Sequence, residues 1–333
     1  MAAYKTLKGQ SIRQVAQDPT NPVVGEIWYN TTTGILKGYM NLQGAWESGG
    51  FLPSVRRSLS GAGTKTSSLG FGGYTTTSTS INTTDEYNGS SWTNGGNMST
   101  GRRNMAGFGI QTAAVGAGGI VNPSTRFSNA TEEYDGSSWT SGGNLANGRD
   151  ILAGAGTLTA GLAFGGYGPP PGSGEDKAFT EEYDGSSWTA GGALNTAVRS
   201  NGGTGTQTAG LSFGGDNPSP GVQTQTEEYN GSSWTLGGNL PFGKEATNGG
   251  GIQTSALSSG GLTSTAVTAG TEQYDGSSWT ATGNLAIARW GLSGDGASKT
   301  TGIVFGGAQP SLTGSTEEFT DPLIITQSIT TST

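Results

Sequence analysis

An eight-residue string recurs five times almost without change, and this repeat constrains the fold of the chain more than any other feature. The string reads EYNGSSWT, EYDGSSWT or QYDGSSWT, and it begins at Glu86, Glu133, Glu182, Glu228 and Gln273. Its tryptophans follow one another at steps of 47, 49, 46 and 45 residues, and a step of 46 back from Trp92 reaches Trp46. The sequence therefore predicts six units.

Three kinds of residue recur with this period. The tryptophans are Trp46, Trp92, Trp139, Trp188, Trp234 and Trp279. Double glycines follow Phe71, Phe164, Phe213 and Phe305, with weaker versions after Ala117 and Ser259. A cation lies ten or eleven residues after each tryptophan, at Arg56, Arg102, Arg149, Arg199, Lys244 and Arg289. We expect each of these positions to have one structural role in every unit.

The units are composed of β-strands. The 62 glycines disfavour helices, and they lack the three-residue period of collagen. In TEEYDGSSWT, two short strands flank an Asp-Gly turn. A two-residue loop would pair Tyr134 with Ser137, and a four-residue loop would pair Tyr134 with Trp139; both leave the two rings on one face. Because one unit cannot bury this face alone, we expect an all-β, six-bladed β-propeller over residues 36–320.

The two ends of the chain supply complementary half-units. The last unit has no tryptophan of its own, and Trp46 has no double glycine before it. We therefore expect the strand near Ala45–Glu47 to lie beside Thr316–Thr320 and to close the ring, which also hides a strand edge. This assignment leaves residues 1–35 as an N-terminal docking arm and residues 321–333 as a C-terminal tail.

Composition excludes several classes of function. The chain has no histidine and no cysteine, which removes Ser-His-Asp hydrolysis, Cys-His proteolysis and zinc hydrolysis, and we expect neither a cofactor nor a metal. The net charge of −8 argues against binding of duplex nucleic acid. No apolar run approaches the ~20 residues of a membrane span, and MAAYKTLKGQS lacks a signal-peptide core, so we expect neither membrane insertion nor secretion by the usual route.

A basic residue, a double glycine, a tyrosine and a tryptophan on a period near 47 resemble the Kelch repeat, from Leu36 to Thr320. The near-verbatim text is similar to Kelch-like repeat proteins encoded by tailed bacteriophages, especially marine and cyanobacterial ones. GEIWYNTTTGILKGY, from Gly25 to Tyr39, resembles segments that begin phage virion proteins. The resemblance implies a virion protein of the tail or particle surface. Galactose oxidase, an enzymatic Kelch relative, needs His and Cys at its copper site, and this chain has neither.

The recurring acids favour a structural role. They precede each aromatic residue by two positions, at Asp85, Glu132, Glu181, Glu227, Glu272 and Glu317. One acid and one cation per unit predict one ion pair within or between blades, with a ring of ligand-binding carboxylates as the alternative. The DGSSW text resembles the Asp-box of sialidases, but it lacks the spacer between Asp and Gly, and we interpret it as a hairpin turn.

Residues that differ between the units are the candidates for binding. In the loops after the double glycines these are Tyr74, Arg126, Phe127, Tyr167, Lys177, Phe179 and Asp216. A second variable set follows the cations, at Arg57, Arg103, Asp150, Ser200, Glu245 and Trp290. Because equivalent loops of a propeller gather on one side, they form either a surface for a sugar or protein, or simply variable loops.

Three functions remain open at this stage. The first is a tail fibre or adhesin that binds a host-surface glycan or protein, or a decoration protein, attached by Lys5, Arg13, Ile27, Trp28 and Tyr29 to other virion proteins or to a second copy of the chain. The second is a glycoside hydrolase that uses carboxylates such as Asp150, Glu175 or Asp216. The third is a cellular Kelch-type interaction module, for which the chain leaves no room for a partner domain.

Overall fold

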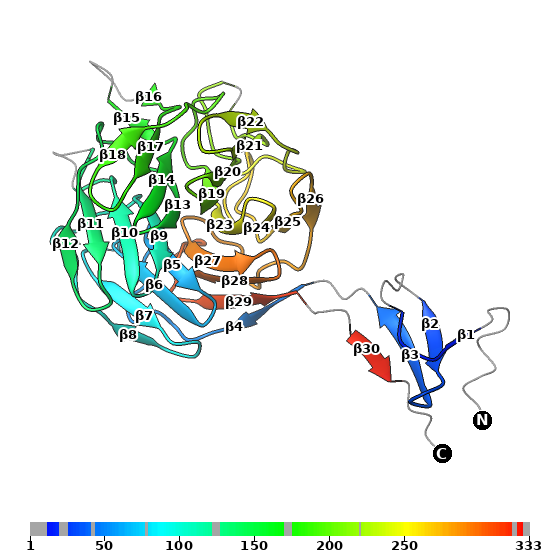
Figure 1. The fold of residues 1–333 in the computed structure, drawn as a ribbon. Coiled ribbons are helices and arrows are strands. Elements are labelled where there is room, and N and C mark those ends of the chain that lie inside the picture. The colour runs from blue at the N-terminus through cyan, green and yellow to red at the C-terminus, as the bar shows by residue number, and fades with distance from the viewer. Residues whose placement is uncertain are drawn as a thin grey trace. The chain divides into compact units, whose positions relative to one another are not determined.

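The computed structural model describes residues 12–19, 26–40, 44–76, 79–121, 127–169, 175–219, 221–321 and 325–328. All regular secondary structure in these residues is β (Figure 1). None of them belongs to a helix with the length and hydropathy that a membrane crossing requires. The chain forms two compact units, residues 1–44 with 321–333 and residues 45–320, which we call the small unit and the large unit.

The described part of the large unit contains six four-stranded antiparallel sheets. The first three are β5 (Ser60–Thr64), β6 (Ser67–Phe71), β7 (Thr84–Tyr87) and β8 (Trp92–Asn94); β9 (Ala106–Ile110), β10 (Ala113–Ala117), β11 (Thr131–Tyr134) and β12 (Trp139–Ser141); and β13 (Ala153–Thr157), β14 (Ala160–Phe164), β17 (Thr180–Tyr183) and β18 (Trp188–Ala190). The next two are β19 (Gly202–Thr206), β20 (Ala209–Phe213), β21 (Thr226–Tyr229) and β22 (Trp234–Leu236); and β23 (Asn248–Ile252), β24 (Ser255–Ser259), β25 (Thr271–Tyr274) and β26 (Trp279–Ala281). The last is β27 (Ser293–Ser298), β28 (Thr301–Phe305), β29 (Thr316–Thr320) and β4 (Ala45–Ser48); a short extra hairpin joins β15 (Tyr167–Gly168) to β16 (Glu175–Asp176).

The first strands of these sheets lie side by side around a common centre (Figure 1). Strand β5 contacts β9, and the series continues through β13, β19, β23 and β27, which contacts β5 again. Strand β4 pairs with β29, with Trp46 opposite Phe319, which is the pairing that the two half-units predict. The large unit is therefore all-β and propeller-like.

The repeated string folds as a hairpin with a four-residue loop. Tyr134 lies opposite Trp139, so the longer of the two predicted loops is the correct one. The Asp135 carboxylate accepts the backbone N–H groups of Ser137 and Ser138 at 2.8 Å each, and these bonds, with the Ser137 hydroxyl, lower its pKa to about 2. Asn88, Asp184, Asn230 and Asp275 cap their own loops in the same way. The DGSSW text is thus a turn, as predicted.

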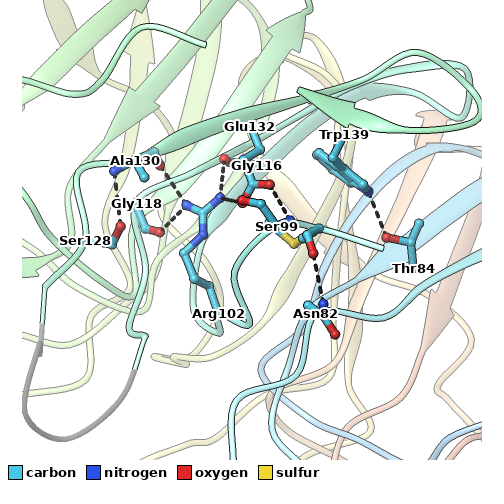
Figure 2. Close-up of polar contacts among 11 residues, drawn as sticks. Asn82, Thr84, Ser99, Arg102, Gly116, Gly118, Ser128, Ala130, Glu132 and Trp139 are labelled. Atoms are coloured by element: carbon cyan, nitrogen blue, oxygen red, sulfur yellow. Dashed lines mark hydrogen bonds and ion pairs between the residues drawn. The ribbon is translucent and has the colours of Figure 1, made fainter. Parts of the chain in front are cut away.

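Adjacent sheets are joined by the repeated tryptophans. The Trp139 indole donates a hydrogen bond of 2.8 Å to the Thr84 hydroxyl of the preceding sheet (Figure 2), and its ring packs against Phe71. The equivalent bonds are Trp46–Thr271, Trp92–Thr316, Trp188–Thr131, Trp234–Thr180 and Trp279–Thr226. Because Trp46 makes the same bond as the other five tryptophans, β4 occupies the position of the fourth strand in its sheet.

The tyrosines of the repeat form a second connection between sheets. Tyr134 donates a hydrogen bond of 2.5 Å to Glu86 of the preceding sheet, and burial raises the pKa of Tyr134 to about 12. The equivalent pairs are Tyr87–Glu318, Tyr183–Glu133, Tyr229–Glu182 and Tyr274–Glu228. At the sixth junction, Phe319 and Gln273 replace the tyrosine and the glutamate together, so this junction has no half-buried carboxylate that would need a tyrosine donor.

The small unit is a four-stranded sheet built from both ends of the chain. Its order is β1 (Arg13–Val15), β2 (Ile27–Asn30), β3 (Ile35–Met40) and β30 (Ile325–Ser328), with β1 parallel to β2. The Asp18 carboxylate accepts hydrogen bonds from Asn30, Trp28 and Lys37, which lower its pKa to about 2. This division differs from the predicted domains 1–35, 36–320 and 321–333. Residues 36–44 belong to the small unit because β3 pairs with β2 and β30.

Candidate functional site at the centre of the large unit

A cavity of about 660 Å³ lies among the first strands of the six sheets. Each of these strands contains a Gly-x-Gly sequence, and the central residues are Ala62, Phe108, Ala155, Thr204, Gly250 and Asp295. The motif lies eleven residues before the double glycine in five units and twelve in the sixth, where β27 has an irregularity after Asp295. This regular spacing was a signal in the sequence that the sequence analysis missed.

The first glycine of the motif permits the first strands to approach one another closely. A Cβ atom on Gly107 would lie 2.8 Å from the carbonyl oxygen of Gly61 on the neighbouring sheet. One on Gly249 would lie 2.4 Å from the carbonyl oxygen of Gly203. Side chains at these positions would force the sheets apart, so the glycines permit the close approach of the first strands that line the cavity.

The mouth of the cavity is bordered by a cycle of six backbone hydrogen bonds. The residues are Ser58, Asn104, Ile151, Ser200, Ala246 and Gly291, and the N–H of each donates to the carbonyl of the one before it, from 2.7 to 3.3 Å. All six have positive φ, including the β-branched Ile151 at +48°. Such a conformation costs about 1–2 kcal/mol for a residue with a side chain, and the repeated hydrogen bond offsets that cost.

The six residues immediately before this cycle vary in chemistry. They are Arg57, Arg103, Asp150, Arg199, Glu245 and Trp290. Each forms a β-bridge with the first residue of a variable loop, at Tyr74, Ile120, Tyr167, Asp216, Leu262 and Ala308 respectively. The variable loops therefore start beside the mouth. Arg57, Tyr74, Arg103, Glu245, Leu262 and Trp290 also line the cavity.

This register corrects the assignment of Arg199 and Ser200. Spacing from the tryptophans predicts Arg199 as the sixth structural cation and Ser200 as a member of the variable set. The structure places Arg199 in the variable set and Ser200 in the hydrogen-bond cycle, while the buried Val198 occupies the cation position. Arg199 forms ion pairs with Asp176 at 2.9 Å and Asp216 at 2.5 Å instead of with Glu227.

The other five cations form buried ion pairs, as predicted. Arg102, which is 0% exposed, donates to Glu132 at 2.8 Å and to the carbonyls of Gly116, Gly118 and Ala130 (Figure 2). The remaining pairs are Arg56–Asp85, Arg149–Glu181, Lys244–Glu272 and Arg289–Glu317. Desolvation lowers the pKa of Arg102, and the negative charge of Glu132 opposes this effect. These charges are satisfied inside the sheets and are not available to a ligand.

The fourth sheet keeps its acid without a cation. Glu227 accepts hydrogen bonds from the backbone N–H groups of Asn195 and Thr196 and from the side-chain amides of Asn195 and Gln225. A small cavity of about 10 Å³ beside Val198 and Glu227 lies where the longer side chain is missing. Four N–H donors thus replace one guanidinium.

The mouth has a basic and aromatic half. The Arg57 guanidinium carbon lies 4.3 Å from the centroid of the Trp290 ring and 5.5 Å from that of Tyr74. Arg103 lies 4.6 Å from the Tyr74 ring and donates to the Ser80 hydroxyl at 2.8 Å. These contacts place the two guanidinium groups against aromatic rings.

The opposite half of the mouth is acidic. Asp176, Asp216 and Glu245 lie around one cation, Arg199, and Asp150 is the mouth residue of the preceding sheet. Burial raises the pKa of Glu245, and the nearby charge of Asp216 raises it further. Burial also raises the pKa of Asp176. The arrangement gives the mouth a basic side and an acidic side.

Asp295 is the carboxylate that the first strands place on the cavity wall. Its oxygens accept the backbone N–H groups of Gly63 at 3.1 Å and Gly296 at 2.7 Å. Burial nevertheless raises the pKa of Asp295 to about 7. The described residues contain no group of three or more acidic side chains that could hold a metal ion.

The remaining predicted loop residues that the structure describes do not line the cavity. The Phe127 ring lies 5.8 Å from that of Tyr167. Lys177 is buried and bonds Glu175 at 2.7 Å, whereas Phe179 is 44% exposed. Arg126 lies outside the described residues.

The predicted docking residues have different environments in the small unit. Trp28 is 1% exposed and belongs to the interior of that unit, so it is not a surface contact. Tyr29 is 37% exposed, Ile27 is half-buried, and the exposed Arg13 pairs with Glu26 at 3.3 Å. Lys5 lies outside the described residues.

Comparison with known proteins does not assign the chain, because neither a family model nor a curated protein matches it. The function must therefore be inferred from the geometry above.

Proposed function

We propose that the chain is a non-enzymatic virion protein of a tailed bacteriophage that binds the host surface, as a tail fibre or an adhesin on the particle. In this proposal the large unit is a six-bladed, Kelch-like β-propeller closed by Ala45–Ser48. The closed cycle of backbone hydrogen bonds and the Trp46–Thr271 bond support that architecture. The resemblance of the repeat and of Gly25–Tyr39 to phage proteins supports the location.

The observation that carries the binding function is the contrast between scaffold and mouth. Every sheet repeats the same tryptophan bond to its neighbour. The residues at the mouth are two arginines, an aspartate, a third arginine, a glutamate and a tryptophan at equivalent positions. A repeated scaffold that presents different side chains around one cavity is suited to recognition, and a cavity of this size falls in the range of about 300–1,000 Å³ that is typical of ligand sites.

Attachment to the particle is assigned to the small unit. Its sheet combines N-terminal strands with the C-terminal strand β30, so that it is tied to the large unit by two chain segments. Ile27, Tyr29 and Arg13 are the predicted docking residues that its described part leaves partly or largely exposed. Other virion proteins or a second copy of the chain are the expected partners.

A glycoside hydrolase is the second candidate, because Asp295 has a pKa of about 7 and lies on the cavity wall. The carboxylates first considered for this role, Asp150, Glu175 and Asp216, do not line the cavity, whereas Glu245 does. The shift in the pKa of Glu245 comes from burial, Asp216, Arg199 and Ser200, and that of Asp295 from burial and the N–H groups of Gly296 and Gly63, so neither carboxylate acts on the pKa of the other. Glycosidases use two carboxylates that work as a pair about 5–10 Å apart. The lack of coupling between Glu245 and Asp295 favours binding over hydrolysis.

The location is tested on purified particles of the phage that carries the gene. Mass spectrometry should detect the protein, and immunogold labelling should place it on the tail or a surface fibre. The purified protein should also compete with the particles for adsorption to host cells. Labelling of the capsid wall without competition would indicate a decoration protein, and absence from the particles would reject the virion proposal. Release of reducing sugars that is lost in Asp295→Asn would favour the hydrolase.

A further inference from the structure

Two arginines at the mouth have no acidic partner. The structure describes 13 of the 16 lysines and arginines, since Lys5, Lys8 and Arg126 fall outside the described residues. Ten of these 13 form an ion pair. The three described cations that do not are Arg57, Arg103 and Lys299. The chain has a net charge of −8, so acidic partners are plentiful. Arg57 and Arg103 nevertheless form no ion pair, and both line the cavity.

The aromatic neighbours hold these arginines without using their hydrogen-bond donors. Arg57 lies against Trp290 and Tyr74, and Arg103 lies against the same tyrosine. Within the described residues, Arg57 donates no side-chain hydrogen bond, and Arg103 donates one, to Ser80. A guanidinium group has five N–H donors in a planar fork that fits a two-oxygen anion. The donors are therefore positioned and still available.

The acidic half of the mouth limits the kind of anion that fits. Glu245 lines the same cavity, and Asp216 and Asp176 lie near it around Arg199. A ligand with negative charge along its whole length, such as an acidic peptide or a nucleic acid, would be repelled there. A ligand with one anionic group and several hydroxyl donors satisfies both halves, because carboxylates accept hydrogen bonds from hydroxyls.

We propose that the mouth of the cavity binds a saccharide that carries an oxyanion, either a carboxylate or a sulfate. The oxyanion lies between Arg57 and Arg103, the sugar packs against Trp290, and hydroxyls of the same or the next sugar point to Glu245. This inference deepens the proposed host-binding function and rests on it for its biological setting. The site itself stands on the free donors, the aromatic neighbours and the cavity.

The test measures binding to the full chain by titration calorimetry. The probes are a trisaccharide of one galacturonate and two neutral sugars, a neutral trisaccharide that carries one sulfate, maltotriose and triglutamate. We expect one of the two anionic sugars to bind at least tenfold more tightly than maltotriose and triglutamate, and the stronger of the two identifies the oxyanion. Affinity should fall as salt is raised, because the contact is charged.

Variants locate the site. Arg57→Gln and Arg103→Gln should each weaken binding of the anionic sugar at least tenfold and leave maltotriose unchanged. The matched control is Lys299→Gln, which removes an unpaired cation that does not line the cavity and should bind like the wild type. Circular dichroism melting curves establish that each variant is folded. The inference would be overturned if the Arg57→Gln, Arg103→Gln double variant bound the anionic sugar as tightly as the wild type does. It would also be overturned if the wild type bound maltotriose as tightly as the anionic sugar, or bound triglutamate more tightly.

The same variants separate this inference from the proposed function. If the protein is found in particles and competes for adsorption, but the Arg57→Gln, Arg103→Gln double variant competes equally well, then host binding stands and the saccharide site is wrong. If the anionic sugar binds as predicted but the protein is absent from particles, then the site stands and the virion role is wrong.

Discussion

Replacement of Arg102 by valine tests how the sheets tolerate a buried charge, because the fourth sheet already has valine at this position. Arg102→Val removes the 2.8 Å ion pair and leaves the buried Glu132 with one N–H donor, from Ser99 at 2.7 Å. Glu227, beside Val198, has four such donors. Since breaking a buried pair from one side costs about 3–5 kcal/mol, we expect the variant to lose that amount of unfolding free energy.

The measurement is urea-induced unfolding of the full chain, followed by tryptophan fluorescence. Thermal unfolding gives a second measurement of the same loss. At about 2 °C per kcal/mol for a unit of this size, the melting temperature should fall by about 6–10 °C. Adding Glu132→Gln should recover part of the loss, because the unpaired charge is then removed. Arg13→Val, at an exposed ion pair, is the control and should change stability by less than about 1 kcal/mol. A loss below 1 kcal/mol in Arg102→Val, or no recovery in the double variant, would refute the reasoning.

Three further changes test two repeated contacts, at Tyr134 and Asp135, and the carboxylate on the cavity wall, Asp295. Tyr134→Phe should cost about 1–3 kcal/mol by leaving Glu86 without its donor, and adding Glu86→Gln should restore most of it in the same urea assay. Because burial raises the pKa of Asp295 to about 7, the folded state holds a proton that the unfolded state releases. The contribution of Asp295 to stability should therefore be fully present below about pH 4 and be lost, by about 2–4 kcal/mol, as the pH rises from about 4 to about 7, and Asp295→Asn should remove this part of the pH dependence. Asp135→Asn should leave amide exchange in its loop unchanged, since Asn88 caps the same turn naturally, whereas Asp135→Ala should accelerate it.

Local chemistry made much of the large unit predictable. Asp-Gly and Asn-Gly turns determine where the hairpins fold, and the aromatic pair that flanks them limits the register to two choices. The absence of a tryptophan from the last unit, together with the isolated Trp46, predicted the pairing of β4 with β29. These features can be predicted from the sequence because the hairpins depend on residues close together in the chain. The pairing of β4 with β29 depends on two incomplete units, one at each end, that complete each other.

The cation positions show where such reading fails. Arg199 differs from the true position, Val198, by one residue, and one residue in an extended chain moves a side chain to the opposite face. Spacing alone therefore predicts Arg199 as one of the buried cations, whereas its side chain belongs to the variable set at the mouth. The six Gly-x-Gly sequences were missed for another reason: in a chain with 62 glycines, only their common distance from the double glycines distinguishes them.

Coupled replacements in the scaffold explain why the mouth is the place to look for function. Where Phe319 removes a hydroxyl, Gln273 replaces the glutamate that would have needed it. Where Val198 removes a cation, Asn195 and Gln225 supply donors to Glu227. At the mouth, Arg199 is likewise compensated by Asp176 and Asp216, whereas Arg57 and Arg103 have no acidic partner. Pairing therefore accounts for the variation inside the sheets and at Arg199, and the two unpaired arginines are the part of the mouth for which we propose a ligand.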